Sequence, residues 1–415
     1  MSSYDPTQIT IAIPAFRAGI DSDRCINSAL EQNPALTKVV ILDNNMSPDR
    51  DIPNKEALIS NGVYKKNEKN VGALNNFIAC WHATSTRYFT WLGDDDFISP
   101  GFSDAIVSAI KVSSPNTTCW AGIPSQYNSR SGIQRSGIFF PDISSPSPIE
   151  RLKQCAHFGK WNYPFYSVVD RDRVSIEPLA SLVDWPASLD GFDWAWSYYL
   201  SISGRINIIP SQLYFYNTQN WIDTNAGNDF VSIYRDNFIM PNAELDFNAI
   251  ESFVCMNRML ITMVLIIIGL EDLEKRKRFS DASPNCSVAN ILVAVLEFIL
   301  GRFLAASMGN LFLNSNSPDM KYIRATANSR SLSIREFMLR VGSVYSSYLK
   351  PECNVNAFIA DALERVTSNS INEVLGKSGF LSMWSVYFSK YTHSMAINRM
   401  RFATLIRQPS RFTIY

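Results

Sequence analysis

The sequence predicts an α/β protein with a mostly parallel sheet flanked by helices, followed by an all-helical region. Strand and helix patterns alternate through the first hundred residues, and long apolar helical stretches follow from about residue 237 onward. Alternation with short links is typical of parallel strands joined by right-handed crossover helices. Because 415 residues exceed one ordinary domain, we expect two domains, residues 1–236 and 237–415.

Four strands are expected before residue 105. The first covers residues 9–13 (ITIAI), a β-branched run that ends at Pro14, and the second covers residues 38–42 (KVVIL). A short strand at Tyr64 and a strand over residues 87–92 (RYFTWL) complete this set. Short apolar runs rich in β-branched residues are typical of strands that are buried on both faces.

Helices are expected between these strands. Asp21 and Asp23 offer a cap for the first helix, which follows the first strand. The clearest helix begins after Asn70, where large apolar residues repeat at i, i+3, i+4 and i+7: Leu74, Phe77, Ile78 and Trp81. This spacing predicts one buried helix face against the sheet.

The middle of the chain, residues 117–216, is less regular. The segments WAGIP and IFFP predict strands, GFDWAWSYYLSISG predicts a helix that Gly204 ends, and two closing strands are expected around Pro210. Later apolar stretches over residues 253–270, 288–313 and 334–349 predict helices, with Ser-, Asn- and Pro-rich joints between them. We therefore expect the second domain to consist of packed helices.

Composition argues against several kinds of partner and site. Lys and Arg together number 38, as do Asp and Glu, so no bulk charge attracts nucleic acid. Seven Cys occur singly and there are three His, which argues against a zinc site and a disulfide scaffold. A reducing, cytoplasmic setting fits this pattern best.

Membrane segments are not expected either. The N-terminal residues lack a basic segment followed by an apolar core, so no signal peptide is visible. The longest apolar run, residues 260–270, is shorter than the roughly 18–20 residues that cross a bilayer. We expect this run to be a buried core helix.

Polar clusters follow three of the expected strands. They are Pro14-Ala15-Phe16, Asp43-Asn44-Asn45 and Asp94-Asp95-Asp96. In parallel α/β sheets, ligands bind at the carboxyl ends of the strands. Three adjacent carboxylates repel one another in a cleft, so they indicate a hard divalent cation such as Mg²⁺ or Mn²⁺. The alternative is a solvated acidic turn before the helix expected at residues 101–110.

The order IPAF, LDNN, NVG and WLGDDDF, with its spacing, resembles the family 2 glycosyltransferases of the GT-A (nucleotide-diphospho-sugar transferase) fold. The resemblance covers roughly residues 8–220 and is strongest before residue 105. It implies that Pro14, Ala15 and Phe16 wall the nucleotide pocket and that Asp43 recognises the base, usually a uracil-type pyrimidine.

The resemblance also assigns the loop and helix start after the third strand. Asn70, Gly72 and Asn75 match positions that lie along the nucleotide and its diphosphate. A helix N-terminus presents unpaired N–H groups and a favourable dipole to phosphate.

The acidic motif departs from the family pattern at one position. Where many members have Leu-Asp-x-Asp-Asp, this chain has Gly93 in place of the first acid. The alignment then implies that Asp95 binds the metal, that Asp94 lies near the ribose, and that Asp96 supplements the ligand set. A register shift of one residue makes Asp94 and Asp96 the metal pair, so the division of roles stays open.

A catalytic base is expected in the segment SLDGFDWAWSYYL. Asp193 matches the family aspartate at the start of a helix that faces the cleft, Phe192 stands where Glu is common, and Asp190 is the reserve candidate. N-terminal capping of this helix is the alternative for both aspartates. Aromatic residues such as Tyr166 are candidates for stacking on a sugar, or for core packing.

These assignments predict an inverting, metal-dependent glycosyltransferase. The donor is expected to be a UDP- or dTDP-sugar, and the acceptor a hydroxyl of a glycan, a lipid-linked sugar or a small molecule. A sugar nucleotidyltransferase and a catalytically silent scaffold of the same fold are the alternatives. Packing, homo-oligomer formation and peripheral membrane contact stay open as uses of the helical region.

Overall fold

The structure is a computed structural model. It describes residues 8–45, 53–132, 134–136, 143–157, 163–186, 191–217, 235–241, 243, 247–276, 287–296, 299 and 332–377. Nine strands in this part of the chain form one sheet. They are β1 (Ile9–Ala15), β2 (Thr37–Asp43), β3 (Gly62–Lys66), β4 (Tyr88–Trp91), β5 (Phe97–Ile98), β6 (Thr117–Tyr127), β7 (Gln134–Ser136), β8 (Val168–Asp170) and β9 (Arg205–Asn217).

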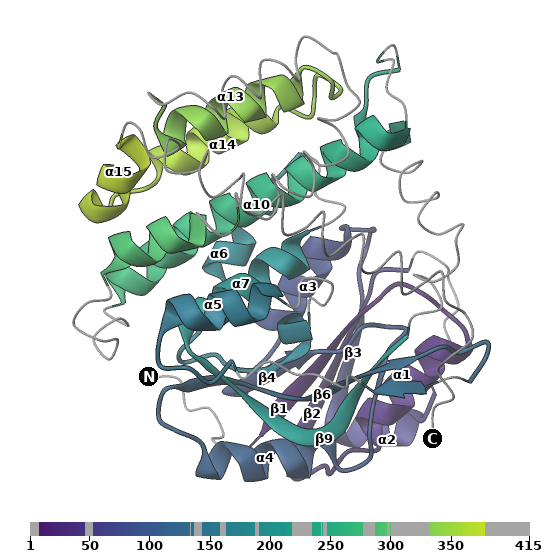
Figure 1. The fold of residues 1–415 in the computed structure, drawn as a ribbon. Coiled ribbons are helices and arrows are strands. Elements are labelled where there is room, and N and C mark those ends of the chain that lie inside the picture. Colours follow the sequence, from purple (N-terminus) through teal and green to yellow (C-terminus); the bar gives the residue numbers. More distant parts are fainter. Residues whose placement is uncertain are drawn as a thin grey trace, which may run out of the picture.

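The helices divide between the two faces of the sheet and a further helical layer (Figure 1). On one face lie α1 (Ile20–Leu30), α2 (Lys55–Asn61) and α4 (Phe102–Val112). On the other lie α3 (Ala73–His82), α5 (Pro148–His157), the 3-10 helix η1 (Tyr163–Tyr166), α6 (Glu177–Ala180) and α7 (Phe192–Ser203). Beyond α7 follow α10 (Phe247–Lys275), α13 (Ile334–Ser346), α14 (Val355–Glu364) and α15 (Asn369–Gly376).

The predicted α/β class is confirmed, with a mixed sheet. Its order is β3-β2-β1-β4-β8-β6-β9-β5, and β7 pairs with β6. Strands β1 to β4 are parallel, and β6 and β9 are parallel to each other. Strand β8 runs antiparallel to both β4 and β6 and joins the two parallel groups. The short strand expected at Tyr64 is part of β3.

One prediction in this region was wrong. The two strands expected around Pro210 are a single strand, β9. Its pairing with β6 shifts register between Ile209 and Tyr214, so Pro210 lies at an irregularity of the ladder. Proline is tolerated at such a bulge because the missing N–H donor is not needed there. The segment IFFP lies outside the described residues.

Alternation along each strand builds two hydrophobic cores. In β1, Ile9, Ile11 and Ile13 belong to the core under α1 and α4, and Ala12 belongs to the core under α3 and α7. All four side chains are fully buried, as expected for a strand covered on both faces.

The helical region continues the second of these cores. A single hydrophobic cluster joins Trp91 in β4 and Trp196 in α7 to Leu265 in α10 and Phe337 in α13. Residues 260–270 are part of α10 and Leu260, Leu265 and Leu270 are fully buried, which confirms the predicted core helix. Among the helices that the structure describes, none has the length and apolar content that crossing a bilayer requires. The predicted domain boundary after residue 236 stays a prediction, since this core runs across it.

Candidate active site

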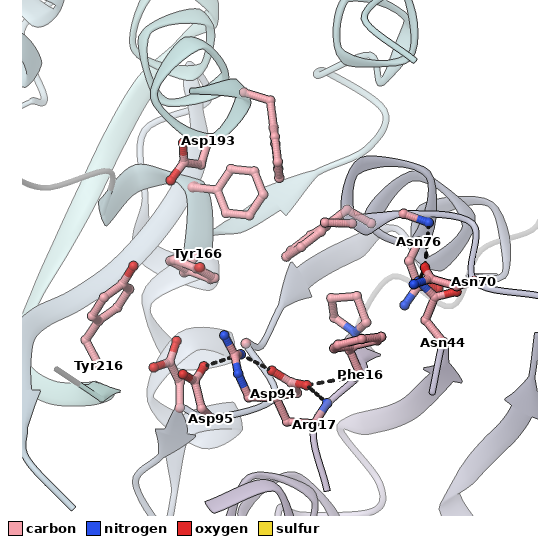
Figure 2. Close-up of a pocket in the computed structure, with 18 of the residues that line it drawn as sticks. Phe16, Arg17, Asn44, Asn70, Asn76, Asp94, Asp95, Tyr166, Asp193 and Tyr216 are labelled. Carbon is pink, nitrogen blue, oxygen red and sulfur yellow. Dashed lines mark hydrogen bonds and ion pairs between the residues drawn. The ribbon is translucent and has the colours of Figure 1, made fainter. Parts of the chain in front are cut away.

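A cavity of about 480 Å³ opens at the carboxyl ends of β1, β2 and β4, between the starts of α3 and α7 (Figure 2). One side, here called the strand-end wall, is mostly polar: Pro14, Phe16, Arg17, Asn44, Asn70, Gly72, Ala73, Asn76, Gly93, Asp94, Asp95 and Asp96. The other side, the aromatic wall, carries rings and one carboxylate: Phe77, Phe165, Tyr166, Gly191, Phe192, Asp193 and Tyr216. Asp193 lies across the cavity from Asp94 and Asp95 (Figure 2).

Asp94 ties the loop after β1 to the loop after β4. Its Oδ2 accepts hydrogen bonds from the backbone N–H groups of Phe16 (2.7 Å) and Arg17 (2.6 Å). Its Oδ1 accepts from Nη1 of Arg17 at 2.7 Å. Two clusters that the sequence places 80 residues apart are therefore held together by one carboxylate.

Arg17 also pairs with Asp95, at 3.4 Å between Nη1 and Oδ1. Burial lowers the pKa of the Arg17 guanidinium, but attraction to Asp95 and Asp94 outweighs this and raises it. Arg17 was not among the site residues predicted from the sequence. Its position directly after IPAF, at a strand end beside the predicted acidic strand end, was the available signal.

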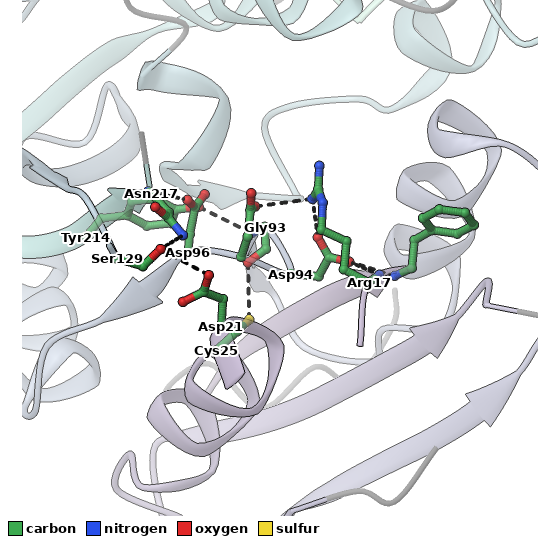
Figure 3. Close-up of polar contacts among 11 residues, drawn as sticks. Arg17, Asp21, Cys25, Gly93, Asp94, Asp96, Ser129, Tyr214 and Asn217 are labelled. Atoms are coloured by element: carbon green, nitrogen blue, oxygen red, sulfur yellow. Dashed lines mark hydrogen bonds and ion pairs between the residues drawn. The ribbon is translucent and has the colours of Figure 1, made fainter. Parts of the chain in front are cut away.

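Asp96 is turned toward β9 (Figure 3). Its carboxylate is buried, and it accepts hydrogen bonds from the Tyr214 hydroxyl (2.6 Å) and the Asn217 N–H (2.8 Å). Burial raises the pKa of Asp96 well above its usual value, and repulsion from Asp95 adds to this. Through these contacts Asp96 links the loop after β4 to β9. Its role as a metal ligand stays a prediction.

The glycine in the acidic motif has a steric reason. A Cβ added at Gly93 would lie 2.7 Å from Oδ2 of Asp96. Its N–H donates to the Tyr214 hydroxyl at 3.3 Å, and its carbonyl accepts from the Cys25 thiol at 3.1 Å (Figure 3). A side chain at position 93 would displace the carboxylate that anchors β9, so this departure from the family pattern follows from packing.

Asparagine side chains position the loop before α3. The Asn44 amide donates to Oδ1 of Asn70 at 2.7 Å, and its own Oδ1 accepts from the N–H of Val71 (2.9 Å) and from Asn67 (3.1 Å). Gly72 follows with φ of 82° and donates its N–H to Asn70 at 2.9 Å. This left-handed turn suits glycine and places the start of α3 at the cavity.

Asn76, rather than the predicted Asn75, lines the cavity. The Asn75 amide donates to the Val71 carbonyl of its own helix turn at 2.9 Å. The Asn76 amide instead donates to the Leu42 carbonyl in β2 at 3.0 Å and its Oδ1 accepts from Asn67. The sequence did not single out Asn76, because two adjacent asparagines on a helix differ only in the direction they face.

Asp43 and Ala15 do not line the cavity among the described residues. Asp43 is fully buried at the end of β2, where it accepts from the Tyr64 hydroxyl and the Asn45 N–H, both at 2.9 Å. Ala15 is buried at the end of β1. Base recognition by Asp43 and a wall position for Ala15 stay predictions.

Asp193 stands in the first turn of α7. The helix is capped by Gly191, with φ of 99°, so Asp193 is not the N-cap residue. A Cβ at Gly191 would lie 2.9 Å from Cγ of Arg258, which shows how closely α10 packs against this turn. The Asp193 Oδ1 accepts from the N–H of Trp194 at 2.8 Å. The reserve candidate Asp190 lies outside the described residues.

Three phenylalanine rings of the aromatic wall pack against one another. Phe77 of α3 contacts Phe165 and Phe192 with ring centroids 5.2 and 5.7 Å apart, and Phe165 stacks on Trp91 at 4.9 Å. Beside them, burial raises the pKa of the Tyr166 hydroxyl well above its usual value, and the nearby hydroxyl of Tyr216 and carboxylates add to this. These rings come from segments far apart in the sequence, so local sequence patterns could not predict that they contact one another.

Comparison with known proteins covers most of the residues that line this cavity. Residues 10–168 match the sequence profile of the family described as Glycosyl transferase family 2. This part of the chain is similar to glycosyltransferase family 2. The matched segment holds Arg17, Asp94 and Asp95 and most of the strand-end wall, while Asp193 follows it in the chain.

Two solved structures are among those that match this chain. Staphylococcus aureus TarS (residues 1–349, with UDP) is 13% identical and has a TM-score of 0.45, covering 98% of this chain and 94% of its own. The mannosyltransferase PcManGT of Pyrobaculum calidifontis, with GDP-Man and Mn²⁺, is 12% identical with a TM-score of 0.34, covering 88% and 87%. No curated protein matches the sequence.

The matched region offers oxygen donors for a divalent cation at Asp94 and Asp95. Among the described residues, no three His, Cys, Asp or Glu side chains are grouped as metal ligands. Cations such as Mg²⁺ at phosphate sites use one or two carboxylates and complete their shell with phosphate oxygens and water. A pair of cavity-lining carboxylates therefore fits a cation that is held jointly with a diphosphate.

Proposed function

We propose that this protein is an inverting family 2 glycosyltransferase that transfers a sugar from a nucleoside diphosphate to an acceptor hydroxyl. The observation that carries the proposal is the arrangement of carboxylates around one cavity. Asp94 and Asp95 lie at the strand ends with the N-terminus of α3, and Asp193 faces them from α7. The charged diphosphate would then bind at the strand ends and the start of α3, and the acceptor hydroxyl would give its proton to Asp193 on the opposite side of the cavity.

The chain's own residues divide the work between the two walls. The start of α3 after Gly72, with its unpaired N–H groups, orients the diphosphate, and Phe16 and Pro14 border the nucleoside. Asp94 and Asp95 would hold Mn²⁺ or Mg²⁺, which supplies Lewis-acid stabilisation of the departing diphosphate when bound.

Asp193 acts as the general base. It accepts the proton of the acceptor hydroxyl as that oxygen forms a bond to the anomeric carbon, and the bond from this carbon to the diphosphate oxygen breaks. The nucleoside diphosphate leaves with the electron pair. Attack from the face opposite the leaving group inverts the anomeric configuration, which is the geometry that a base across the cavity from the phosphate site supports.

We propose that α10 stabilises the first turn of α7, which carries Asp193. Arg258 of α10 packs on Gly191, and a Cβ at Gly269 would lie 2.5 Å from the ring of Tyr199 in α7. We also propose a cytoplasmic location and a glycan, lipid-linked or small-molecule acceptor.

The experiment that tests the function is a thermal-shift panel of UDP-, dTDP- and GDP-sugars, each with and without Mn²⁺, followed by turnover assays on any stabilising donor. A ligand at a hundredfold excess over Kd stabilises by about 2.7 kcal/mol. We expect one donor to raise the melting temperature in the presence of Mn²⁺ and to be hydrolysed slowly without acceptor. A panel with no stabilising donor and no hydrolysis would favour a catalytically silent scaffold, and release of pyrophosphate from a nucleoside triphosphate and a sugar 1-phosphate would favour a nucleotidyltransferase.

A further inference from the structure

Arg17 is the one Lys or Arg among the described residues that line the cavity. Its Nη1 lies 2.7 Å from Oδ1 of Asp94 and 3.4 Å from Oδ1 of Asp95. One nitrogen thus contacts carboxylates of two adjacent residues, as a bridging metal cation would. The guanidinium offsets the repulsion between these two charges, whose side chains are only 6% and 14% exposed.

The position of Asp94 does not depend on this guanidinium. Its second oxygen, Oδ2, accepts from the backbone N–H groups of Phe16 and Arg17 at 2.7 and 2.6 Å. The backbone of Arg17 is therefore fixed, while its side chain remains 53% exposed. The side chain has room to leave the carboxylates without disturbing the loop that holds Asp94.

A divalent cation in contact with Oδ1 of Asp94 and Asp95 would repel the guanidinium that lies against the same two atoms. We therefore expect the guanidinium to give up these contacts when Mn²⁺ or Mg²⁺ binds there. A diphosphate in the same cavity offers it a new partner, because arginine forms charge-assisted, bidentate hydrogen bonds with phosphate oxygens.

We propose that Arg17 is an exchangeable counter-ion of the donor site, which neutralises Asp94 and Asp95 before binding and moves to the diphosphate when a divalent cation replaces it. This rests on the proposed function, since it takes a nucleoside diphosphate as the ligand. Arg17 then makes the binding of metal and nucleotide interdependent. A metal ion that binds alone has to displace the guanidinium from its two carboxylates without offering it a new partner. When the nucleotide binds as well, its diphosphate is the new partner.

The test is Mn²⁺ affinity of the full chain without nucleotide, measured from the electron paramagnetic resonance signal of free Mn²⁺. We expect Arg17→Gln to bind Mn²⁺ about tenfold more tightly than the wild type, within the usual range of coupling between ligands. Arg17→Lys keeps a positive charge and should stay within about threefold of the wild type. Arg365→Gln, which removes an arginine from an exposed pair with Asp361 on α14, is the matched control and should change nothing.

The second measurement is calorimetric titration of UDP, dTDP and GDP with and without Mn²⁺. In the wild type, Mn²⁺ should strengthen binding of the preferred diphosphate, and Arg17→Gln should weaken that diphosphate about tenfold in metal-free buffer. The double variant Arg17→Gln/Asp95→Asn should lose the gain in Mn²⁺ affinity, because it has only one of the two carboxylates, that of Asp94. Circular dichroism confirms that each variant is folded.

Several outcomes overturn the exchange. If Arg17→Gln binds Mn²⁺ no more tightly than the wild type does, the guanidinium only stabilises the loop. Failure of both proteins to bind Mn²⁺ overturns it as well, and donor turnover in metal-free buffer then shows whether sugar transfer stands without it. A tenfold gain in Mn²⁺ affinity together with no turnover of any donor would keep the exchange and overturn the proposed function.

Discussion

The two walls of the cavity are held in place by different kinds of interaction. The strand-end wall is held by polar contacts within one stretch of the chain: Asp94 to the backbone of Phe16 and Arg17, and Asn44 to Asn70. The aromatic wall is held by packing among α3, η1, α7 and α10, which extend from Ala73 to Lys275. In the proposed function the strand-end wall handles charge and the aromatic wall handles the acceptor, so a change in each wall should affect a different measured quantity.

The largest effect is expected from the single carboxylate of the aromatic wall. Asp193→Asn keeps the shape of the side chain but removes its capacity to accept a proton, so kcat should fall about a thousandfold. Binding of the nucleoside diphosphate with Mn²⁺ should remain within about twofold, because the strand-end wall is intact. The measurements are product formation and calorimetry.

Asp184→Asn, at an exposed position before α7, serves as the control and should leave both quantities unchanged. Retention of a tenth or more of wild-type kcat by Asp193→Asn would assign the base to another group and leave Asp193 with a role in the helix start.

The next effect concerns the start of β4, where this strand pairs with β8. Arg87 donates from Nε and Nη2 to the two carboxylate oxygens of Asp170 at 3.0 and 2.7 Å, and the Asp170 side chain is 1% exposed. Arg87→Ala leaves this buried carboxylate with Arg173 at 3.3 Å, so we expect a loss of about 3 kcal/mol in the free energy of unfolding.

Urea denaturation measures this loss. Arg365→Ala, which breaks the exposed pair with Asp361, should cost less than about 1 kcal/mol. Equal losses in the two variants would mean that the Arg87 pair contributes no more than a surface contact.

A smaller effect should distinguish two asparagines of the strand-end wall. Asn44→Ala removes the acceptor of the Val71 N–H and the donor to Asn70, so nucleotide affinity should fall about tenfold and stability by about 1–2 kcal/mol. Asn75→Ala removes only a bond within its own helix turn and should change nucleotide affinity less than twofold.

Calorimetry with the preferred diphosphate compares the pair. A greater loss of affinity in Asn75→Ala than in Asn44→Ala would restore the sequence-based assignment of Asn75 to the nucleotide.

The smallest effect lies behind the aromatic wall, where α10 meets the loop before α15. Burial raises the pKa of Glu271, but hydrogen bonds from Lys275 and from Thr367 outweigh it and lower the pKa below its ordinary value. The stabilisation is therefore complete above the ordinary glutamate pKa and is lost as the pH falls through the lowered value.

Glu271→Gln should reduce the free energy of unfolding by about 1 kcal/mol at pH 7 and should flatten its decline between about pH 5 and pH 3. Urea denaturation across this range is the measurement. Parallel pH curves for the two proteins would contradict the assignment of this acid dependence to Glu271.

Much of the strand-end wall was predictable because its parts follow directly from local patterns. Strands β1, β2 and β4 are apolar runs with clear ends, and parallel pairing brings those ends to one edge. Pro14, Phe16, Asp94, Asp95 and Asp96 follow these strands and line the cavity, as do Asn70 and Gly72, which the family resemblance assigned. The direction of individual side chains was not predictable, as Asn75, Asp43 and Asp96 show.

The order of strands and helices in the first hundred residues, and the buried character of α10, were decided by local patterns: continuous apolar runs for the strands and α10, and a helical repeat for α3. An apolar repeat of two or of 3.6 residues specifies which face is buried, whatever the partner is. The pairing of Arg17 with both aspartates, the steric need for Gly93 and the facing of Asp193 across the cavity were decided by tertiary structure. Each depends on the meeting of side chains from distant segments, and those distances are set by packing across the whole core rather than by neighbours in the chain.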